Sequence, residues 1–389
     1  MQQMAEGINR SVRVLPRGAC GHRAPSVTRA DRQSKDDKDA SSDLSRAAYF
    51  VLGMHRSGTS AITQVLALSG ATLPENVMPG DEHNAKGYFE PWRIAVFNDQ
   101  RLRAGGSAWD DPFAFPYRAL EPREEKRWIT RATDLFDEEF AGARHPLMKD
   151  PRVSVLGPLW RAVLHDLGLP VRAVIPVRHP LAVAGSLARR DGFPVEKSLL
   201  VWVAYMLGAE ACSRDLPRAF VAYDALLSDW RGEVARIEAA HGAPLPALTP
   251  QAAKAIDGFL TRELRHNEAA EDLAKIPGIG PLAAQVYDWF VAAAADQPRP
   301  PEDLAAAAKA LKKMQQAMGV FVSPVTSDLA AARAELLEAR QLAVFEQARV
   351  QDLEARLAAL QSAHAAEAEV QRQLDAALDA ILDHTLGES

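Results

Sequence analysis

One segment constrains the fold of this chain more than any other: an apolar run that passes directly into a glycine loop and then into a helical pattern. The run Ala47–Leu52 reads AAYFVL and is followed at once by Gly53, which is typical of a buried strand in a parallel sheet. Beyond the loop, apolar residues recur at helical spacing from Ala61 to Leu68 and stop at Gly70. The chain is therefore predicted to open with a strand, a loop and a helix.

Two later segments repeat this arrangement. Residues 173–177 and 219–223 are predicted to be strands, and Pro180 is placed to begin the helix after the first of them. Strands that alternate with helices indicate an α/β fold, in which a parallel sheet is covered by helices on both faces as three layers. Ligands of such folds bind at the carboxyl ends of the strands.

Composition excludes several classes of protein. A net charge of -6 over 389 residues argues against nucleic acid as a partner, because a nucleic-acid surface has to displace phosphate counterions with basic side chains. Cys20 and Cys212 provide neither metal-ligand spacing nor a disulfide framework, which favours a reducing compartment. We find no apolar run of membrane-spanning length and no secretory signal, so we expect a cytoplasmic protein with no membrane span.

Three regions follow from the distribution of residue types. Residues 1–46 are rich in charge and poor in large apolar side chains, so we expect a disordered leader. Residues 47–323 are predicted to form the α/β domain, which ends in Pro-rich links and helices that include 304–318. Residues 324–389 are predicted to form a long helix or coiled coil.

The last region carries a seven-residue repeat. Its apolar positions are Leu329, Leu336, Ala343, Val350 and Leu357, joined by Leu353 and Leu360. Residues 326–383 would span about 85 Å as a helix, so we expect a partner helix and a homo-oligomer formed through 326–383. His364 and Gln371 interrupt the repeat, and a hairpin folded back on the domain, or a different protein partner, is the alternative.

The loop Gly53–Ser60 reads GMHRSGTS and lies between the predicted strand and helix. In that position backbone N–H groups and the positive end of the helix dipole point at an anion. Compared with the nucleoside-triphosphate loop G-x-x-x-x-G-K-[ST], the lysine after the second glycine is replaced by Thr59, and the cation is Arg56 within the loop. An ATP-hydrolysing or kinase site is therefore disfavoured, although a kinase with a degenerate loop remains an alternative.

A basic residue followed by Ser-Gly-Thr-Ser after a strand resembles the 5′-phosphosulfate loop of the sulfotransferases that use 3′-phosphoadenosine 5′-phosphosulfate. That family uses cations and hydroxyls without a metal. The resemblance implies that Arg56 contacts the bridging oxygen of the donor and that Ser57, Gly58, Thr59 and Ser60 bind its 5′-phosphate. Eukaryotic cytosolic members have Lys-Ser-Gly-Thr here; arginine preserves the charge but does not donate a proton.

The donor has a second anion, its 3′-phosphate, which requires another cationic site. Arg178 follows a predicted strand, and Ser186 lies eight residues later on the next helix. Because both can converge on one phosphate, and because the resembled family carries an arginine and a serine at this spacing, Arg178 and Ser186 are expected to bind the 3′-phosphate. His179 is expected to be structural.

Three further strings are similar to bacterial, glycan-associated sulfotransferases, and the resemblance covers about residues 47–270. They are Gly87-Tyr88-Phe89-Glu90, Lys149-Asp150-Pro151-Arg152 and Leu264-Arg265-His266. Lys149 and Arg152 are candidates for binding an anionic acceptor, or they neutralise Asp150.

Sulfuryl transfer needs a base that takes the proton of the acceptor. Glu90 is our first candidate, with His83 and His55 as competitors. The predicted function is transfer of a sulfuryl group to a hydroxyl or amine of a glycan or another small polar acceptor. The alternative from a different class is a non-catalytic sulfotransferase-like module that the coiled coil oligomerises.

Overall fold

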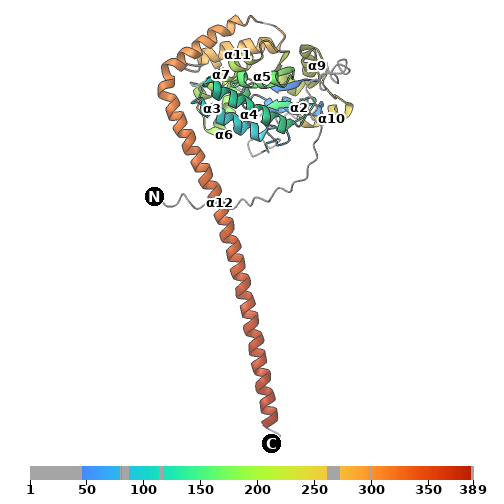
Figure 1. Ribbon diagram of the computed structural model, residues 1–389, viewed down its shortest axis with the longest axis vertical. Helices are drawn as coiled ribbons and strands as arrows, with labels where there is room; N and C mark the ends of the chain where they lie inside the picture. The colour runs from blue at the N-terminus through green and yellow to red at the C-terminus, as the bar shows by residue number, and fades with distance from the viewer. Residues whose placement is uncertain are drawn as a thin grey trace, which may run out of the picture. The chain divides into compact units, whose positions relative to one another are not determined.

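A computed structural model describes residues 46–78, 80, 87–113, 117–260, 272–297 and 299–386. Elements are labelled as in Figure 1. The predicted leader lies outside the described residues, apart from Arg46. Among those that are described, no helix combines the length and the apolar character needed to cross a bilayer.

The centre of the domain is a parallel sheet of four strands in the order β2-β1-β3-β4. The strands are β1 (Ala48–Val51), β2 (Leu147–Lys149), β3 (Val171–Val177) and β4 (Arg218–Ala222). Parallel neighbours need a crossover, and the helices between the strands supply it here. Figure 1 shows helices around the strands. The carboxyl ends of all four strands consequently meet at one edge of the sheet.

The helices between the strands are α2 (Thr59–Leu68), α3 (Trp92–Ala104), α4 (Pro122–Phe140), η2 (Pro151–Ser154), α5 (Gly157–Asp166), α6 (Pro180–Asp191) and α7 (Val195–Ser213). After β4 come α8 (Tyr223–Ser228), α9 (Trp230–His241), α10 (Pro250–Phe259), η4 (Leu273–Lys275), α11 (Gly280–Ala294) and α12 (Glu302–Leu386).

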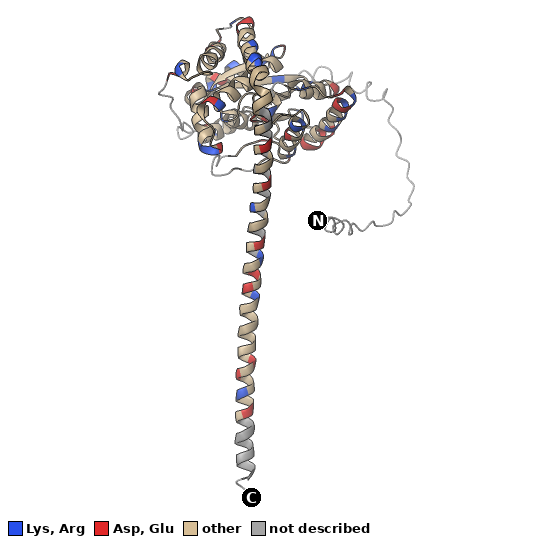
Figure 2. Cartoon of the chain, turned by 90° about the vertical axis from the view of Figure 1, so that its left-hand side faces the viewer, with Lys and Arg blue, Asp and Glu red and all other residues tan. Residues whose placement is uncertain are grey.

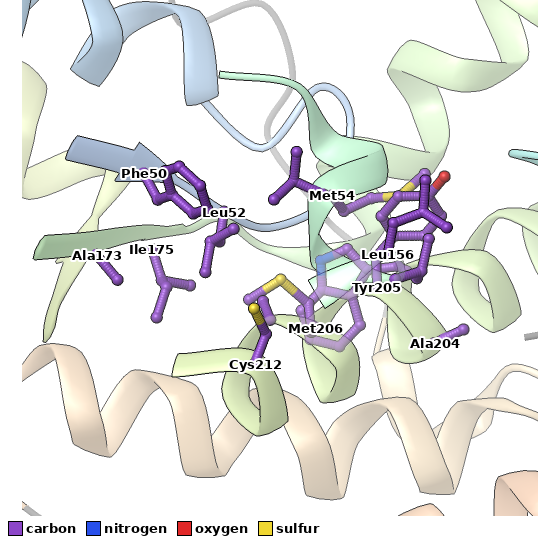
Figure 3. Packing of buried hydrophobic residues seen from close by; sticks show 14 of the residues in the cluster. Phe50, Leu52, Met54, Leu156, Ala173, Ile175, Ala204, Tyr205, Met206 and Cys212 are labelled. Carbon is purple, nitrogen blue, oxygen red and sulfur yellow. The ribbon is translucent and has the colours of Figure 1, made fainter. Parts of the chain in front are cut away.

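The two faces of the sheet bury separate apolar clusters, because successive strand residues point in opposite directions. Phe50 and Leu52 belong to a cluster with α5, α7 and α11, whereas Tyr49 and Val51 belong to one with α2 and α9. Figure 3 shows the first cluster near the loop, where Leu52 points toward Met206 of α7. The predicted α/β class, with helices on both faces of a parallel sheet, is confirmed.

The long C-terminal helix is present, but its extent differs from the prediction. The segments 304–318 and 326–383, predicted as separate helices, are parts of one helix that begins at Glu302. The sequence suggested a boundary at Pro324 because proline lacks a backbone donor and disfavours helix before it. The backbone nevertheless stays helical there. The first turns pack into the core through Leu304, Ala307 and Leu311, which are buried.

Candidate functional site

The loop after β1 turns sharply before α2 begins. Its backbone has positive φ at Gly53, Arg56 and Gly58, with values of 121°, 65° and 91°. Gly58 is the N-cap of α2, and a Cβ added there would overlap the ring of Tyr223 on α8. A side chain is therefore excluded at Gly58 both by backbone conformation and by space. The result is a tight loop whose N–H groups lie at the N-terminus of α2.

Arg56 joins the two anion-binding segments predicted from the sequence. Its Nε donates a hydrogen bond to Ser186 Oγ on α6 at 2.8 Å. The carbonyl oxygen of Arg56 accepts a hydrogen bond from Arg178 Nη1 at 3.0 Å. Residues separated by more than 120 positions in the chain thus meet at one point, because β1 and β3 are adjacent parallel strands that end side by side.

The guanidinium of Arg178 is held from a second side. Its Cζ lies 4.6 Å from the centroid of the Tyr223 ring, a distance at which the aromatic face attracts a cation. Burial lowers the pKa of Arg178 from its ordinary value, although Tyr223 and Asp224 act in the opposite direction. A cation partly removed from water in this way favours an anionic ligand that would restore the lost solvation.

Two polar atoms of the loop are buried and have no hydrogen-bond partner among the described residues: His55 Nε2 and Ser57 Oγ. Buried polar groups are almost always hydrogen-bonded in folded proteins. Their position on the loop that precedes α2 is consistent with a ligand that completes their bonding.

Lys149 and Glu90 form a buried ion pair beside the loop. Lys149 Nζ lies 2.6 Å from Glu90 Oε1, and the side chains are only 2% and 6% exposed. The same ammonium donates to the Tyr88 carbonyl at 2.9 Å and to Ser60 Oγ at 3.4 Å. The end of β2, the GYFE string and the first turn of α2 are therefore fastened together at a single cation.

Arg152 extends this polar network away from Glu90. Arg152 Nη1 lies 3.9 Å from Glu90 Oε2 and closer, at 3.0 Å, to Asp150 Oδ1. Arg152 Nε lies 2.6 Å from Asp99 Oδ1. Burial alone would lower the pKa of Arg152, but these carboxylates outweigh it and raise the pKa well above the usual range. Burial raises the pKa of Asp99 despite the neighbouring Arg152.

His55 is buried beside two aromatic side chains. Its ring packs edge-on against Trp109 and Tyr205, with centroid distances of 4.9 and 5.7 Å. Burial holds the pKa of His55 well below its ordinary value, and the nearby cations Arg152 and Arg190 act in the same direction. The imidazole is consequently neutral at physiological pH.

The remaining candidates differ in what the structure says of them. His83 and the string Leu264-Arg265-His266 lie outside the described residues. His179 Nδ1 accepts a hydrogen bond from Leu181 N at 3.3 Å and so caps α6.

Several residues around the loop had no sequence signal of their own. Ser154 Oγ accepts a hydrogen bond from Gly53 N at 2.8 Å and fixes the start of the loop. Asn98 donates to Asp150 at 2.8 Å and accepts from Trp160, which orients the carboxylate. The sequence predicts Tyr223 only as a strand residue, whereas it is the first residue of α8, directly after β4. Its position at the same sheet edge as Arg178 is the signal that would have found it.

Comparison with known proteins gives matches only among solved structures. The sequence matches no protein-family description and no curated protein. A sulfotransferase domain from the olefin synthase of Synechococcus PCC 7002 is 16% identical, with a TM-score of 0.37 over 63% of this chain and 94% of that one. The sulfotransferase domain of the curacin biosynthetic pathway is 13% identical, with a TM-score of 0.37; the match covers 61% of this chain and 96% of that one.

A third solved structure, a sulfotransferase from Mycobacterium tuberculosis H37Rv, is 13% identical, with a TM-score of 0.31 over 58% of this chain and 75% of that one. The function of the chain is therefore inferred from the contacts around Arg56.

Proposed function

We propose that this chain transfers a sulfuryl group from 3′-phosphoadenosine 5′-phosphosulfate to a hydroxyl or amine of a glycan or another polar acceptor. The observation that carries the proposal is the meeting of both predicted anion anchors at Arg56. Its guanidinium contacts Ser186 and its carbonyl contacts Arg178. One donor molecule with two anionic ends requires two such anchors side by side.

The residues present fit this donor. Arg56 and the N-terminus of α2 suit the 5′-phosphosulfate. Ser57 Oγ, a buried hydroxyl without a hydrogen-bond partner in the described part of the chain, suits the same group. Arg178 and Ser186 suit the 3′-phosphate through charge-assisted hydrogen bonds. The loop lacks the lysine that a triphosphate site places after its second glycine.

The proposed reaction forms a bond between the acceptor oxygen or nitrogen and sulfur, while the bond from sulfur to the bridging phosphate oxygen breaks. Negative charge grows on that oxygen and on the departing bisphosphate. Arg56 is placed to stabilise this charge, which is the kind of interaction that lowers a transition-state barrier. The acceptor proton passes to a base on the protein.

Two described groups are candidates for that base. Glu90 keeps its place as first candidate: Oε1 is engaged by Lys149, and Oε2 makes the longer contact with Arg152 and is the oxygen we propose for the acceptor. His55 is the competitor, since its ring is neutral and its Nε2 has no hydrogen-bond partner among the residues that the structure describes. Variants at these two positions decide between them.

Ligand-dependent melting tests the proposal directly. Adenosine 3′,5′-bisphosphate in the presence of a metal chelator should raise the melting temperature, because a ligand at 100 times its Kd stabilises the native state by about 2.7 kcal/mol. Arg178→Ala should abolish most of that shift. Arg161→Ala is the matched control, because Arg161 pairs with Asp215 on the surface. Stabilisation by ATP with magnesium, and none by the bisphosphate, would refute the proposal.

A further inference from the structure

The helix α12 leaves the core early and then carries an apolar stripe in water. Its contact with the rest of the domain includes the buried Leu304 and Leu311 and a hydrogen bond from Gln315 Nε2 to the Pro112 carbonyl at 2.8 Å. Farther along, the apolar positions of the seven-residue repeat are exposed: Leu329, Leu336, Val350, Leu353, Leu357 and Leu360, at 44–68%.

The repeat defines two core positions, termed a and d, of a coiled coil. Val350 and Leu357 are at a, while Leu353 and Leu360 are at d, so every core position within residues 350–360 is apolar, and these four residues are termed the apolar block. Of these, Val350 at a with leucine at d is the combination that favours two strands. One straight helix cannot cover its own stripe, so the block requires a second helix.

Charges beside this stripe identify the second helix and its direction. Position g is the residue just before a, and position e is the residue just after d. In a parallel coiled coil whose two helices are in register, a residue at g faces the residue at e that lies five positions later in the other helix. Glu335 at g then faces Arg340 of the second copy, and Arg349 at g faces Glu354 of the second copy. Each pair joins two side chains of opposite charge, and each pair occurs twice in a symmetric dimer.

We propose that α12 pairs with α12 of a second copy of this chain as a parallel, in-register, two-stranded coiled coil. All four charged side chains are exposed. Figure 2 shows basic and acidic residues interspersed along α12. Arg349 also lies 3.9 Å from Glu346 of its own helix, a long contact that leaves it able to reach across. Two polar residues flank the block: Glu346 at position d before it and His364 at position a after it. Because sliding one helix along the other would bring these polar side chains against the apolar block, they favour the in-register pairing.

Cysteine cross-linking measures the direction of the two strands. The background is the full-length chain with Cys20→Ser; the native Cys212 is buried, and burial raises its pKa to about 11, so it reacts slowly. Val350→Cys should oxidise to a symmetric disulfide dimer, since a faces a in a parallel pair. In an antiparallel pairing of the block, Val350 would face Leu360. Cross-linking only in a mixture of Val350→Cys with Leu360→Cys would therefore overturn the proposal.

Charge reversal tests the register. Arg349→Glu should weaken the dimer about tenfold, because two attractive pairs become repulsive. Adding Glu354→Arg should restore the dissociation constant. Arg372→Glu is the matched control: it makes the same change of charge at an outward position, where Arg372 pairs with Glu369 of its own helix. It should leave the dimer unchanged.

Sedimentation equilibrium of the full-length proteins gives these dissociation constants. A monomeric wild-type chain at micromolar concentration would overturn the proposal, as would failure of the double variant to restore pairing. Neither result would affect the proposed sulfotransferase activity, since the variants lie on α12 far beyond its last turn packed on the core.

Discussion

Lys149 and Glu90 lie 2.6 Å apart with both side chains almost completely buried, and they connect strand β2 to the segment that precedes α3. Lys149 also reaches Ser60 in the first turn of α2. The ammonium of Lys149 is therefore shared by Glu90, our candidate base, and by Ser60 of the loop Gly53–Ser60. A change at Glu90 should consequently alter both the stability of the protein and its turnover.

Glu90→Gln should lower turnover roughly 10²-fold or more by removing the proposed proton acceptor, with bisphosphate affinity near normal. The same change leaves Lys149 buried without its carboxylate, which costs about 3–5 kcal/mol of unfolding free energy. The double variant with Lys149→Met should recover part of this stability but none of the turnover. Chemical denaturation and donor-dependent turnover measure the two effects separately. Unchanged turnover in Glu90→Gln, beside a large loss in His55→Gln, would transfer the role of base to His55.

Arg56 and Arg178 should contribute to different steps. Arg178→Ala removes the contact that we propose with the 3′-phosphate in the ground state and should mainly raise the Kd for the bisphosphate. Arg56→Ala should mainly lower kcat, because its charge is needed most as the leaving oxygen becomes negative. Calorimetric titration and steady-state kinetics check the two outcomes. Equal effects of both variants on Kd and kcat would contradict this division.

Gly58→Ala should abolish bisphosphate binding while the domain stays folded. The backbone φ of 91° is unfavourable for alanine, and the added methyl group would overlap the Tyr223 ring, which stacks on Arg178. The loop and the second anchor would both be displaced. Gly142→Ala is the matched control, because φ is 77° there and nothing lies within 4 Å of the added Cβ. Only the first variant should lose ligand-induced stabilisation.

Much of this site follows from the sequence because the loop and the Arg178 segment each come directly after an apolar strand. Parallel topology then brings their ends together, which is how Arg56 meets Ser186. Strand β2 was not predicted: three residues that include a lysine carry too little apolar pattern. The partnership of Lys149 with Glu90 depends on that strand, so it could not be predicted either. Pro324 suggested a helix boundary that tertiary structure does not have.

Acid should destabilise the protein partly through His55. Burial holds its folded pKa well below the ordinary value of 6.5. The unfolded chain therefore binds the proton first, and stability falls as pH drops below about 6.5, by at most about 1.4 kcal/mol per pH unit for this group. His55→Gln should flatten the dependence between pH 7 and pH 5, whereas His165→Gln, a change at an exposed side chain, should not. Denaturation midpoints across that range provide the measurement. Equal slopes in both variants would show that His55 is not the group responsible.

Two truncations should separate the roles of the two parts of α12. Ending the chain after Pro324 keeps Leu304, Ala307 and Leu311, which are buried against the core. That protein should be monomeric by light scattering, with the melting temperature and bisphosphate binding of the full-length chain. Ending the chain at residue 301 removes those three side chains as well and uncovers apolar surface of α7 and α11. The loss of a buried leucine alone costs about 2–5 kcal/mol, so the shorter protein should melt at a clearly lower temperature. Equal melting temperatures for the two truncations would show that the first turns of α12 do not contribute to the stability of the core.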